Sequence, residues 1–346
     1  MKDSRGILIC GEAVDGKITT ITKELVNIGR RLSENINQPL RLLLIGQSLQ
    51  EEASEMASLG PDVYLVHDVS FAESIPERYV AIIAEVCQKA VPSIVIFGQT
   101  DMGRDVAPRL AARLKAAVCM DCVDMTVDPE TGSLFLTKPV YGGNAVAVWA
   151  SSDRKPQIVT VRQRAIAPAE SDASAKGEII PLTVEIDSSM FKSTLLESVK
   201  EEPKGVNLEE AKVVVAGGGG IGGSEGFKLL EELAHLLGGA LGISRVPCDE
   251  GWMPANLEIG QTGHVVSPDL YIAVGISGAP QHLAGCSGSK CIVAINKNPE
   301  AHIFTEANFG IVEDYRKVLP PLIEKIKTLK GPARAYPPFS TALKKE

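Results

Sequence analysis

Residues 243–296 read ISRVPCDEGWMPANLEIGQTGHVVSPDLYIAVGISGAPQHLAGCSGSKCIVAIN, and they are the most informative stretch of the chain. Within them the apolar run 270–274 ends in GISGAPQH at 275–282. This pattern is typical of a buried strand that leads through a small-residue loop into a helix. Glycine lets a ligand approach the backbone closely, and the first turn of a helix offers unpaired N–H donors. The stretch therefore predicts a ligand-binding turn.

Strands and helices alternate through the rest of the C-terminal region. A β-branched run leads into GGGGIGG at 217–223 and then into a segment with apolar residues at helical spacing. Strands are expected at 212–216, 240–243, 270–274, 291–295 and 310–312. Parallel strands end at one edge of a sheet, and doubly wound folds bind their ligands at that edge. The residues expected there are Ser244, Arg245, Ser277, Asn296 and Asp314.

The glycine-rich loop at 217–223 satisfies the dinucleotide-binding pattern G-x-G-x-x-G in two registers. That pattern also requires an acidic residue after the second strand, to hold a ribose. Here the second strand ends in Ser244 and Arg245 instead. Taken alone, the loop is therefore consistent either with a bound ligand or with a turn that packs closely under a helix.

The N-terminal region also alternates in the manner of βαβ units around a parallel sheet. Strands are expected at 6–10, 41–45, 63–66 and 93–97, with helical spacing at 21–32 and 80–86. The loop GQTDMGRD at 98–105 is interpreted as an ordinary turn rather than a phosphate-binding loop. Four further strands at 118–127, 134–140, 146–150 and 157–161 are expected to extend the first sheet as antiparallel partners.

Length and composition set the remaining expectations. A chain of 346 residues with 45% apolar composition can bury two cores. We expect an α/β protein of two domains, 1–204 and 205–330, each built on a mainly parallel sheet flanked by helices, with a tail at 331–346. The boundary is expected at VKEEPKG, residues 199–205. A net charge of −8 argues against a nucleic-acid partner, and no run is long enough to cross a bilayer.

Seven irregularly spaced cysteines, without a signal sequence, indicate a reducing compartment and favour a cytoplasmic location. Cys119 and Cys122 form a Cys-x-x-Cys pair. A zinc or redox role for such a pair normally comes with a second ligand pair or a helix start, and neither is evident. The sequence therefore favours buried, inert thiols and no metal site.

The runs GQTG at 260–263, LYIAVGISGAPQHLAG at 270–285 and IVAINKNPEAHIF at 292–304 closely resemble the alpha subunits of electron-transfer flavoproteins. The resemblance spans almost the whole chain and is densest in the second domain. It implies a doubly wound FAD-binding C-terminal domain and a heterodimer with a beta subunit. The FAD would pass electrons between a dehydrogenase, such as an acyl-CoA dehydrogenase of fatty acid oxidation, and an acceptor such as a membrane quinone reductase.

The resemblance also implies a role for individual residues, none of them catalytic in its own right. Arg245 would lie over the flavin ring and favour its anionic reduced states, Thr262 would lie near N5, and His282 near the pyrimidine carbonyl. The whole implied cofactor-binding set is Ser244, Arg245, Ile259, Gly260, Gln261, Thr262, Ser277, Gly278, Ala279, Pro280, Gln281, His282, Asn296, Asp314 and Tyr315. Each residue also has a structural interpretation: a surface ion pair for Arg245, a neutral packed histidine for His282, ordinary turn residues for Thr262 and Ser277.

Gly219 departs from the family pattern, because many members have an arginine there that neutralises the cofactor's phosphates. Three hypotheses therefore remain open. The first is the FAD-binding electron carrier, either a simple carrier or the alpha subunit of a bifurcating, NADH-using complex. The second is an NAD-dependent dehydrogenase, and the third is an assembly subunit that has lost its cofactor.

Overall fold

The computed structural model describes residues 5–67, 75–143, 145–150, 155–170, 176–184, 192–193, 196–197 and 206–330. The chain divides into two compact units. The first comprises Met1–Pro139 and Val146–Val199, and the second Val140–Ala145 and Lys200–Glu346. The sequence-predicted boundary segment 199–205 and the predicted tail 331–346 lie outside the described residues.

The first unit is built on a seven-stranded sheet in which every neighbouring pair of strands is parallel. In spatial order the strands are β12 (Ile179–Pro181), β5 (Asp62–Val66), β4 (Leu40–Ile45), β1 (Ile7–Cys10), β6 (Ile94–Gly98), β11 (Gln157–Val161) and β7 (Ala117–Cys122). A short hairpin, β2 (Ala13–Val14) with β3 (Lys17–Ile18), follows β1. The strands predicted at 6–10, 41–45, 63–66 and 93–97 are thus confirmed.

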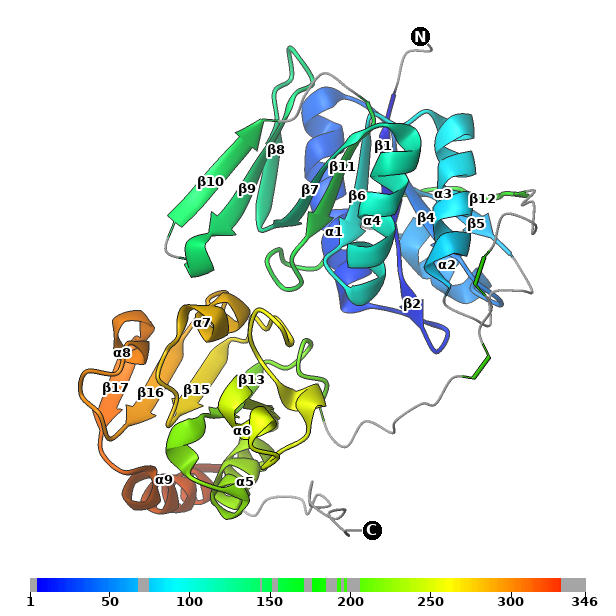
Figure 1. The fold of residues 1–346 in the computed structure, drawn as a ribbon. Coiled ribbons are helices and arrows are strands. Elements are labelled where there is room, and N and C mark those ends of the chain that lie inside the picture. Colours follow the sequence, from blue (N-terminus) through cyan, green and yellow to red (C-terminus); the bar gives the residue numbers. More distant parts are fainter. Residues whose placement is uncertain are drawn as a thin grey trace. The chain divides into compact units, whose positions relative to one another are not determined.

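Helices cover both faces of this sheet (Figure 1). Residues Ile7 and Ile9 of β1 pack into a core with α1 (Thr20–Ile36) and α2 (Gln50–Ala57). Residue Leu8, between them, packs into the opposite core with α3 (Pro76–Ala90) and α4 (Asp101–Leu114). This alternation follows from the two-residue repeat of a strand, and burial on both faces explains why β1 and β6 are continuously apolar.

The predicted antiparallel extension of the first sheet is wrong. The expected strand at 118–127 is two strands, β7 and β8 (Asp124–Val127), which belong to different sheets. β8 pairs antiparallel with β9 (Leu134–Val140) in a separate three-stranded sheet that also contains β10 (Ala145–Ala150). β11 is buried at every position and runs parallel to both β6 and β7. The division falls at Val123, and the left-handed backbone of Asp121, with φ 65°, makes β7 irregular just before its end.

The second unit contains a five-stranded parallel sheet, in the order β14 (Ala240–Ile243), β13 (Val213–Gly217), β15 (Leu270–Val274), β16 (Ile292–Asn296) and β17 (Phe309–Val312). Helices α5 (Phe227–Leu237) and α9 (Tyr315–Lys330) pack on one face, while α7 (Pro280–Cys286) and α8 (Ile303–Glu306) lie on the other (Figure 1). The predicted doubly wound fold is confirmed. Because the chain leaves β13 toward β14 on one side and later returns to β15 on the other, the strand order reverses between β13 and β15, which is where such folds bind ligands.

Candidate cofactor-binding site

The loops that follow β13 and β15 interlock at the point where the strand order reverses. The Gly218 N–H donates to the Val274 carbonyl at 2.9 Å, and the Gly220 N–H donates to the Gly275 carbonyl at 2.9 Å. A Cβ atom on Gly218 would lie 2.4 Å from the Gly275 oxygen, so no larger residue fits there. Part of the glycine-rich sequence therefore has a packing cause, as one of the two sequence interpretations expected.

The outer part of the same loop has no such constraint. Gly222 and Gly223 have φ angles of 79° and 148°, and a Cβ atom on either would meet nothing within 4 Å. Gly219 is exposed, and a Cβ atom there would lie 3.1 Å from Cγ1 of Val246. The loop thus presents bare backbone outward, as a phosphate-binding turn requires.

Tyr315 supports the glycine-rich loop through a hydrogen bond. Its side chain is buried, and its hydroxyl donates to the Ile221 carbonyl at 3.0 Å. Asp314, just before α9, accepts a hydrogen bond from the Arg316 N–H at 2.9 Å and so caps the helix. The structure therefore gives both residues local structural contacts, and it brings Tyr315 to the glycine-rich loop.

Ser244 and Arg245 follow β14 at the same edge. The Ser244 N–H donates to the Gly217 carbonyl at 2.9 Å, which ties this turn to the end of β13. Arg245 opens the short helix α6 (Arg245–Asp249), and its side chain is 66% exposed. Its Nε donates to Asp249 at 3.2 Å, one helical turn away, in an ion pair open to solvent.

A loop at 258–264 joins this edge to the start of α7. The Ile259 N–H donates to the Ile243 carbonyl at 2.8 Å, and the Gln261 N–H donates to the Gln281 carbonyl at 2.8 Å. Gly260 is buried at this crossing, whereas Gln261 and Thr262 are exposed. The Thr262 hydroxyl donates to Glu258 at 2.7 Å, a contact that the sequence did not indicate.

The β15 loop supplies Ser277, Gly278 and Ala279 before α7 begins at Pro280. Gly278 has φ 85°, and a Cβ atom there would lie 2.2 Å from the Ile303 nitrogen, so glycine is required. The Ser277 carbonyl accepts from the Ile303 N–H at 3.0 Å. Asn296, the last residue of β16, donates from Nδ2 to the Ile276 carbonyl at 2.8 Å and thereby supports the loop.

His282 is buried on α7, with both ring nitrogens bonded inside the chain. Nδ1 lies 2.9 Å from the Ile259 carbonyl, and Nε2 lies 2.9 Å from the Tyr271 hydroxyl. A carbonyl can only accept, so Nδ1 carries the proton and Nε2 accepts from Tyr271. Burial lowers the pKa of His282 to about 4, so the ring is neutral at physiological pH.

Tyr271 is the partner that sequence reasoning missed. It lies in the apolar strand β15, is fully buried, and has the sequence pattern of an ordinary core residue. Burial raises its pKa well above the usual tyrosine value, so its hydroxyl stays protonated and donates. Only the spatial approach of β15 and α7 reveals the pair.

The polar side chains at this edge fit a dinucleotide, whose linking ribityl and phosphate groups are polar and partly charged. Among the described residues, the side chains of Gln261, Ser277 and Gln281 are exposed and make no hydrogen bond to protein. Gln261 and Ser277 lie in loops and Gln281 in the first turn of α7, and the Gln261–Gln281 and Ser277–Ile303 backbone bonds hold these segments in place. Their polar groups are therefore free to bond a ligand at the carboxyl edge of the sheet.

Comparison with known proteins identifies the class of this fold and site. The family model described as "Electron transfer flavoprotein domain" matches residues 7–187, and the one described as "Electron transfer flavoprotein FAD-binding domain" matches residues 207–287. The chain therefore belongs to the electron transfer flavoprotein family.

Within that family the similarity is to alpha subunits. The chain is 41% identical to electron transfer flavoprotein subunit alpha of Thermoanaerobacterium thermosaccharolyticum, covering 95% of this chain and 100% of the relative. It is 42% identical to the Bacillus subtilis subunit alpha, over 93% of this chain and 98% of the relative. It is also 33% identical to lactate dehydrogenase (NAD(+),ferredoxin) subunit LctC of Acetobacterium woodii, over 93% of this chain and 77% of the relative.

No helix within the described residues is both long enough and apolar enough to span a bilayer. The same residues contain no cluster of three or more histidine, cysteine or acidic side chains placed to hold a metal ion.

Proposed function

We propose that this chain is the FAD-binding alpha subunit of a two-subunit electron-transfer flavoprotein, located in the cytoplasm. Its partner would be a beta subunit. The complex would pass electrons from flavoprotein dehydrogenases, such as acyl-CoA dehydrogenases, to an acceptor such as a membrane quinone reductase. The observation that carries the proposal is the set of exposed, unpaired polar side chains on fixed loops at the carboxyl edge of the second sheet, in a chain of this family.

FAD supplies the reversible redox chemistry when it is bound, and the protein binds it and adjusts its electronics. Arg245 is the residue best suited to that adjustment. Its ion pair with Asp249 uses Nε, is open to solvent and is therefore weak. The guanidinium is thus available to stabilise added negative charge on a ring beside it.

We assign the other residues by what their contacts leave available. Gln261, Ser277 and Gln281 would bind the ribityl and phosphate groups, with Ser244 beside them, and the bare backbone at 219–223 would take part. Thr262 would bond a flavin nitrogen in exchange for its bond to Glu258. The adenosine end would lie toward Asn296 and Asp314.

His282 has a different assignment from the one that the resemblance implied. Donation to a flavin carbonyl would require it to give up its Nδ1 bond to Ile259 or to change tautomer. We propose that it acts as a positioning residue, holding the 258–264 loop against α7 through the Ile259 carbonyl. Ile259, Gly260, Ala279 and Pro280 would then contribute shape and backbone rather than side-chain bonds.

One observation favours a second candidate, the alpha subunit of an NADH-using bifurcating complex. The Acetobacterium woodii relative carries a name that includes both NAD(+) and ferredoxin. The two other hypotheses have less support. An NAD-dependent dehydrogenase lacks its ribose-binding acid, because β14 is followed by Ser244 and Arg245. Loss of the cofactor rests on Gly219 alone.

The test is to purify the full chain co-expressed with an electron-transfer flavoprotein beta subunit and to identify the released cofactor by mass spectrometry. We expect FAD at one equivalent per alpha chain, and little FAD on the alpha chain expressed alone. NAD in place of FAD would support the dehydrogenase hypothesis. A complex without any nucleotide would support the assembly subunit, and either result would refute the proposal.

A further inference from the structure

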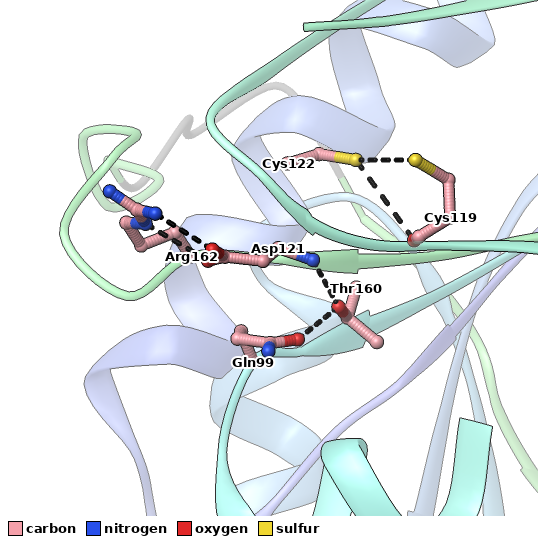
Figure 2. Close-up of polar contacts among 6 residues, drawn as sticks. All are labelled: Gln99, Cys119, Asp121, Cys122, Thr160 and Arg162. Carbon is pink, nitrogen blue, oxygen red and sulfur yellow. Dashed lines mark hydrogen bonds and ion pairs between the residues drawn. The ribbon is translucent and has the colours of Figure 1, made fainter. Parts of the chain in front are cut away.

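The pair Cys119 and Cys122 lies in β7, in the first unit, whereas the candidate cofactor site belongs to the second. Figure 2 shows the two side chains. The two sulfur atoms are 3.6 Å apart. In a regular strand, residues three apart point to opposite faces and are separated by about 10 Å along the chain. The sulfurs therefore meet only because the backbone between them is not a regular strand.

A bulge in β7 causes this approach. Cys119 stands opposite Val159 of β11 and Cys122 opposite Val161, so that Met120 and Asp121 together face the single residue Thr160. Asp121 has a left-handed backbone with φ 65°. The extra residue turns Cys122 back to the side of Cys119, because it shifts the alternation of the strand by one.

Three contacts hold the bulge in place, as Figure 2 shows. The Asp121 N–H donates to the Thr160 hydroxyl at 2.8 Å, and that hydroxyl donates in turn to Gln99. The Asp121 carboxylate receives two bonds from the buried Arg162 guanidinium, at 2.9 and 2.7 Å. Such a bidentate pair fixes the carboxylate in orientation as well as position. The positions of both cysteines are therefore set by a local framework and not by chance packing.

The two thiols differ in access and in acidity. Cys122 is fully buried, whereas Cys119 is only half-buried. The Cys122 S–H donates to the Cys119 sulfur, with the Cys119 carbonyl oxygen as a longer second acceptor at 4.0 Å. The bond to sulfur, together with the charge of Lys138, lowers the pKa of Cys119 against the opposing effect of burial. The same bond and burial raise the pKa of Cys122. An accessible, acidic thiol next to a buried one is the arrangement of an attacking and a resolving cysteine.

We propose that Cys119 and Cys122 form a reversible dithiol–disulfide site that reacts with small-molecule disulfides. The Cys119 thiolate attacks one sulfur of the small disulfide, which releases one small thiolate and leaves a mixed disulfide on Cys119. Cys122 then gives its proton to the released small thiolate and attacks the Cys119 sulfur, which releases the second small thiolate, protonated in turn by solvent. The two cysteines are oxidised by two electrons in total, and the small disulfide is reduced to two thiols.

Other cysteines and other uses of the pair fit less well. Cys10 and Cys87 are both buried, and burial raises the pKa of both thiols, so neither is the accessible, acidic thiol that would start the exchange. Zinc would need further ligands, and the described residues offer no third histidine, cysteine or acidic group suitably placed. The sequence-based expectation of two buried, inert thiols is therefore replaced for Cys119, which is half-buried and activated.

The test treats the reduced, full-length chain with oxidised glutathione at pH 7, followed by an acid quench. Intact mass and peptide mapping of 116–138, which contains both cysteines and no others, give the product. We expect the loss of two hydrogens, a Cys119–Cys122 disulfide, and full reversal by dithiothreitol. A stable glutathione adduct, or no reaction of either cysteine, would overturn the proposal.

Variants separate the two roles. Cys122→Ala should retain glutathione on Cys119 as a mixed disulfide, because nothing resolves it. It should also slow alkylation of Cys119 by iodoacetamide at pH 7 by about fivefold, because the thiolate loses its S–H donor. Cys119→Ala should not react at residue 122, and Cys291→Ala, which removes another half-buried thiol, should behave like the unaltered chain. Equal reactivity of the two single variants would contradict the division into attacking and resolving thiols.

Discussion

Arg245 shows how a residue at a sheet edge can be available for a ligand even when it already has a partner. Its contact with Asp249 is an exposed ion pair one helical turn apart, of a kind that contributes little to stability. Replacing Arg245 with alanine should lower the flavin reduction potential by about 20 mV or more for the two-electron couple, equivalent to ~1 kcal/mol. Redox titration of the complex measures this.

The matched controls for this substitution are Arg245→Lys and Asp249→Asn. Lysine keeps the charge and should retain most of the potential. Asparagine removes the ion pair but leaves the guanidinium in place, so the potential should stay unchanged or rise slightly. An Arg245→Ala complex whose titration curve coincides with that of the unaltered complex would exclude the role assigned to Arg245.

Gly219 allows the opposite experiment, the addition of a charge. Its φ is not in the left-handed region, and a Cβ atom there meets only Val246 Cγ1 at 3.1 Å, so a side chain fits after a small shift. Gly219→Arg should tighten FAD binding about fivefold at low salt, because a cation is added beside the predicted phosphate path. Equilibrium dialysis against FAD measures the change.

Gly219→Ala controls for the loss of glycine at this position and should bind FAD as the unaltered chain does. The gain from arginine should shrink with added salt, as expected for a solvent-exposed charge. Equal affinity of the arginine and alanine variants at every salt concentration would show that the phosphates do not pass Gly219.

Which of these residues the sequence could identify depends on the kind of contact. Arg245, Ser277 and Asn296 were expected at one edge because each follows an apolar run, and the structure has each of them at the carboxyl end of a parallel strand. Tyr271 was missed because a tyrosine in an apolar strand has the same pattern whether or not its hydroxyl meets a histidine. The partner of a buried polar atom is set by the tertiary structure, and the local sequence does not show it.

Among the secondary-structure elements, strands that carry a local sequence signal were predicted correctly, and strands that depend on distant contacts were not. The doubly wound unit follows from apolar runs and small-residue loops, which are local features. β7 and β8 were merged because residues 118–127 are continuously strand-like, and the bulge at Asp121 depends on Thr160 and Arg162, some forty residues later. β11 likewise joins the first sheet because it is buried on both faces, and its neighbours in sequence do not indicate this.

Helix α1 contains an acidic residue in its buried face. Glu24 is 2% exposed and accepts from the Arg164 N–H at 2.7 Å, and burial raises its pKa to about 7. Between pH 4.5 and 7 the folded state therefore holds a proton that the unfolded state has lost. The free energy of unfolding should consequently fall as pH rises through this window, on the order of 3 kcal/mol in total.

Glu24→Gln removes that titration and keeps an acceptor for Arg164. The variant should gain stability over the unaltered chain as pH rises from 4.5 to 7, measured by urea unfolding. The fluorescence of Trp149, in a Trp252→Phe background, reports the first unit. A stability difference that does not change with pH would show that Glu24 is already ionised in the folded state.

His282, on helix α7, gives the free energy of unfolding the opposite dependence on pH. Its pKa of about 4 is below the ordinary value of 6.5, so the unfolded state binds more protons between these limits. The free energy of unfolding should therefore fall as pH drops from 6.5 to 4, again on the order of 3 kcal/mol. His282→Asn should remove this dependence, with Trp252 fluorescence in a Trp149→Phe background as the probe.

His302→Asn is the matched control, since His302 is exposed at the start of α8. It should leave the pH dependence of the second unit unchanged. If His282→Asn and His302→Asn have the same slope, His282 is not the buried neutral group that the structure describes.

For the whole molecule, composition alone suggested two cores, and the structure contains two compact units with a parallel sheet in each. The sequence resemblance and the family matches agree on an electron-transfer flavoprotein alpha subunit. The spacing of Cys119 and Cys122 did not predict that their sulfur atoms meet, because that approach depends on a bulge held by distant residues. The cofactor site and the dithiol site lie in different units and can be tested independently.

The most direct test of the central claim is the visible absorption spectrum of the complex of this chain with its beta subunit, followed during stepwise reduction. The account predicts the spectrum of one bound flavin, reduced by a flavoprotein dehydrogenase with its substrate and reoxidised by an added acceptor. A second flavin that NADH reduces would indicate the bifurcating alternative. A colourless complex, or a flavin that no dehydrogenase reduces, would contradict the account.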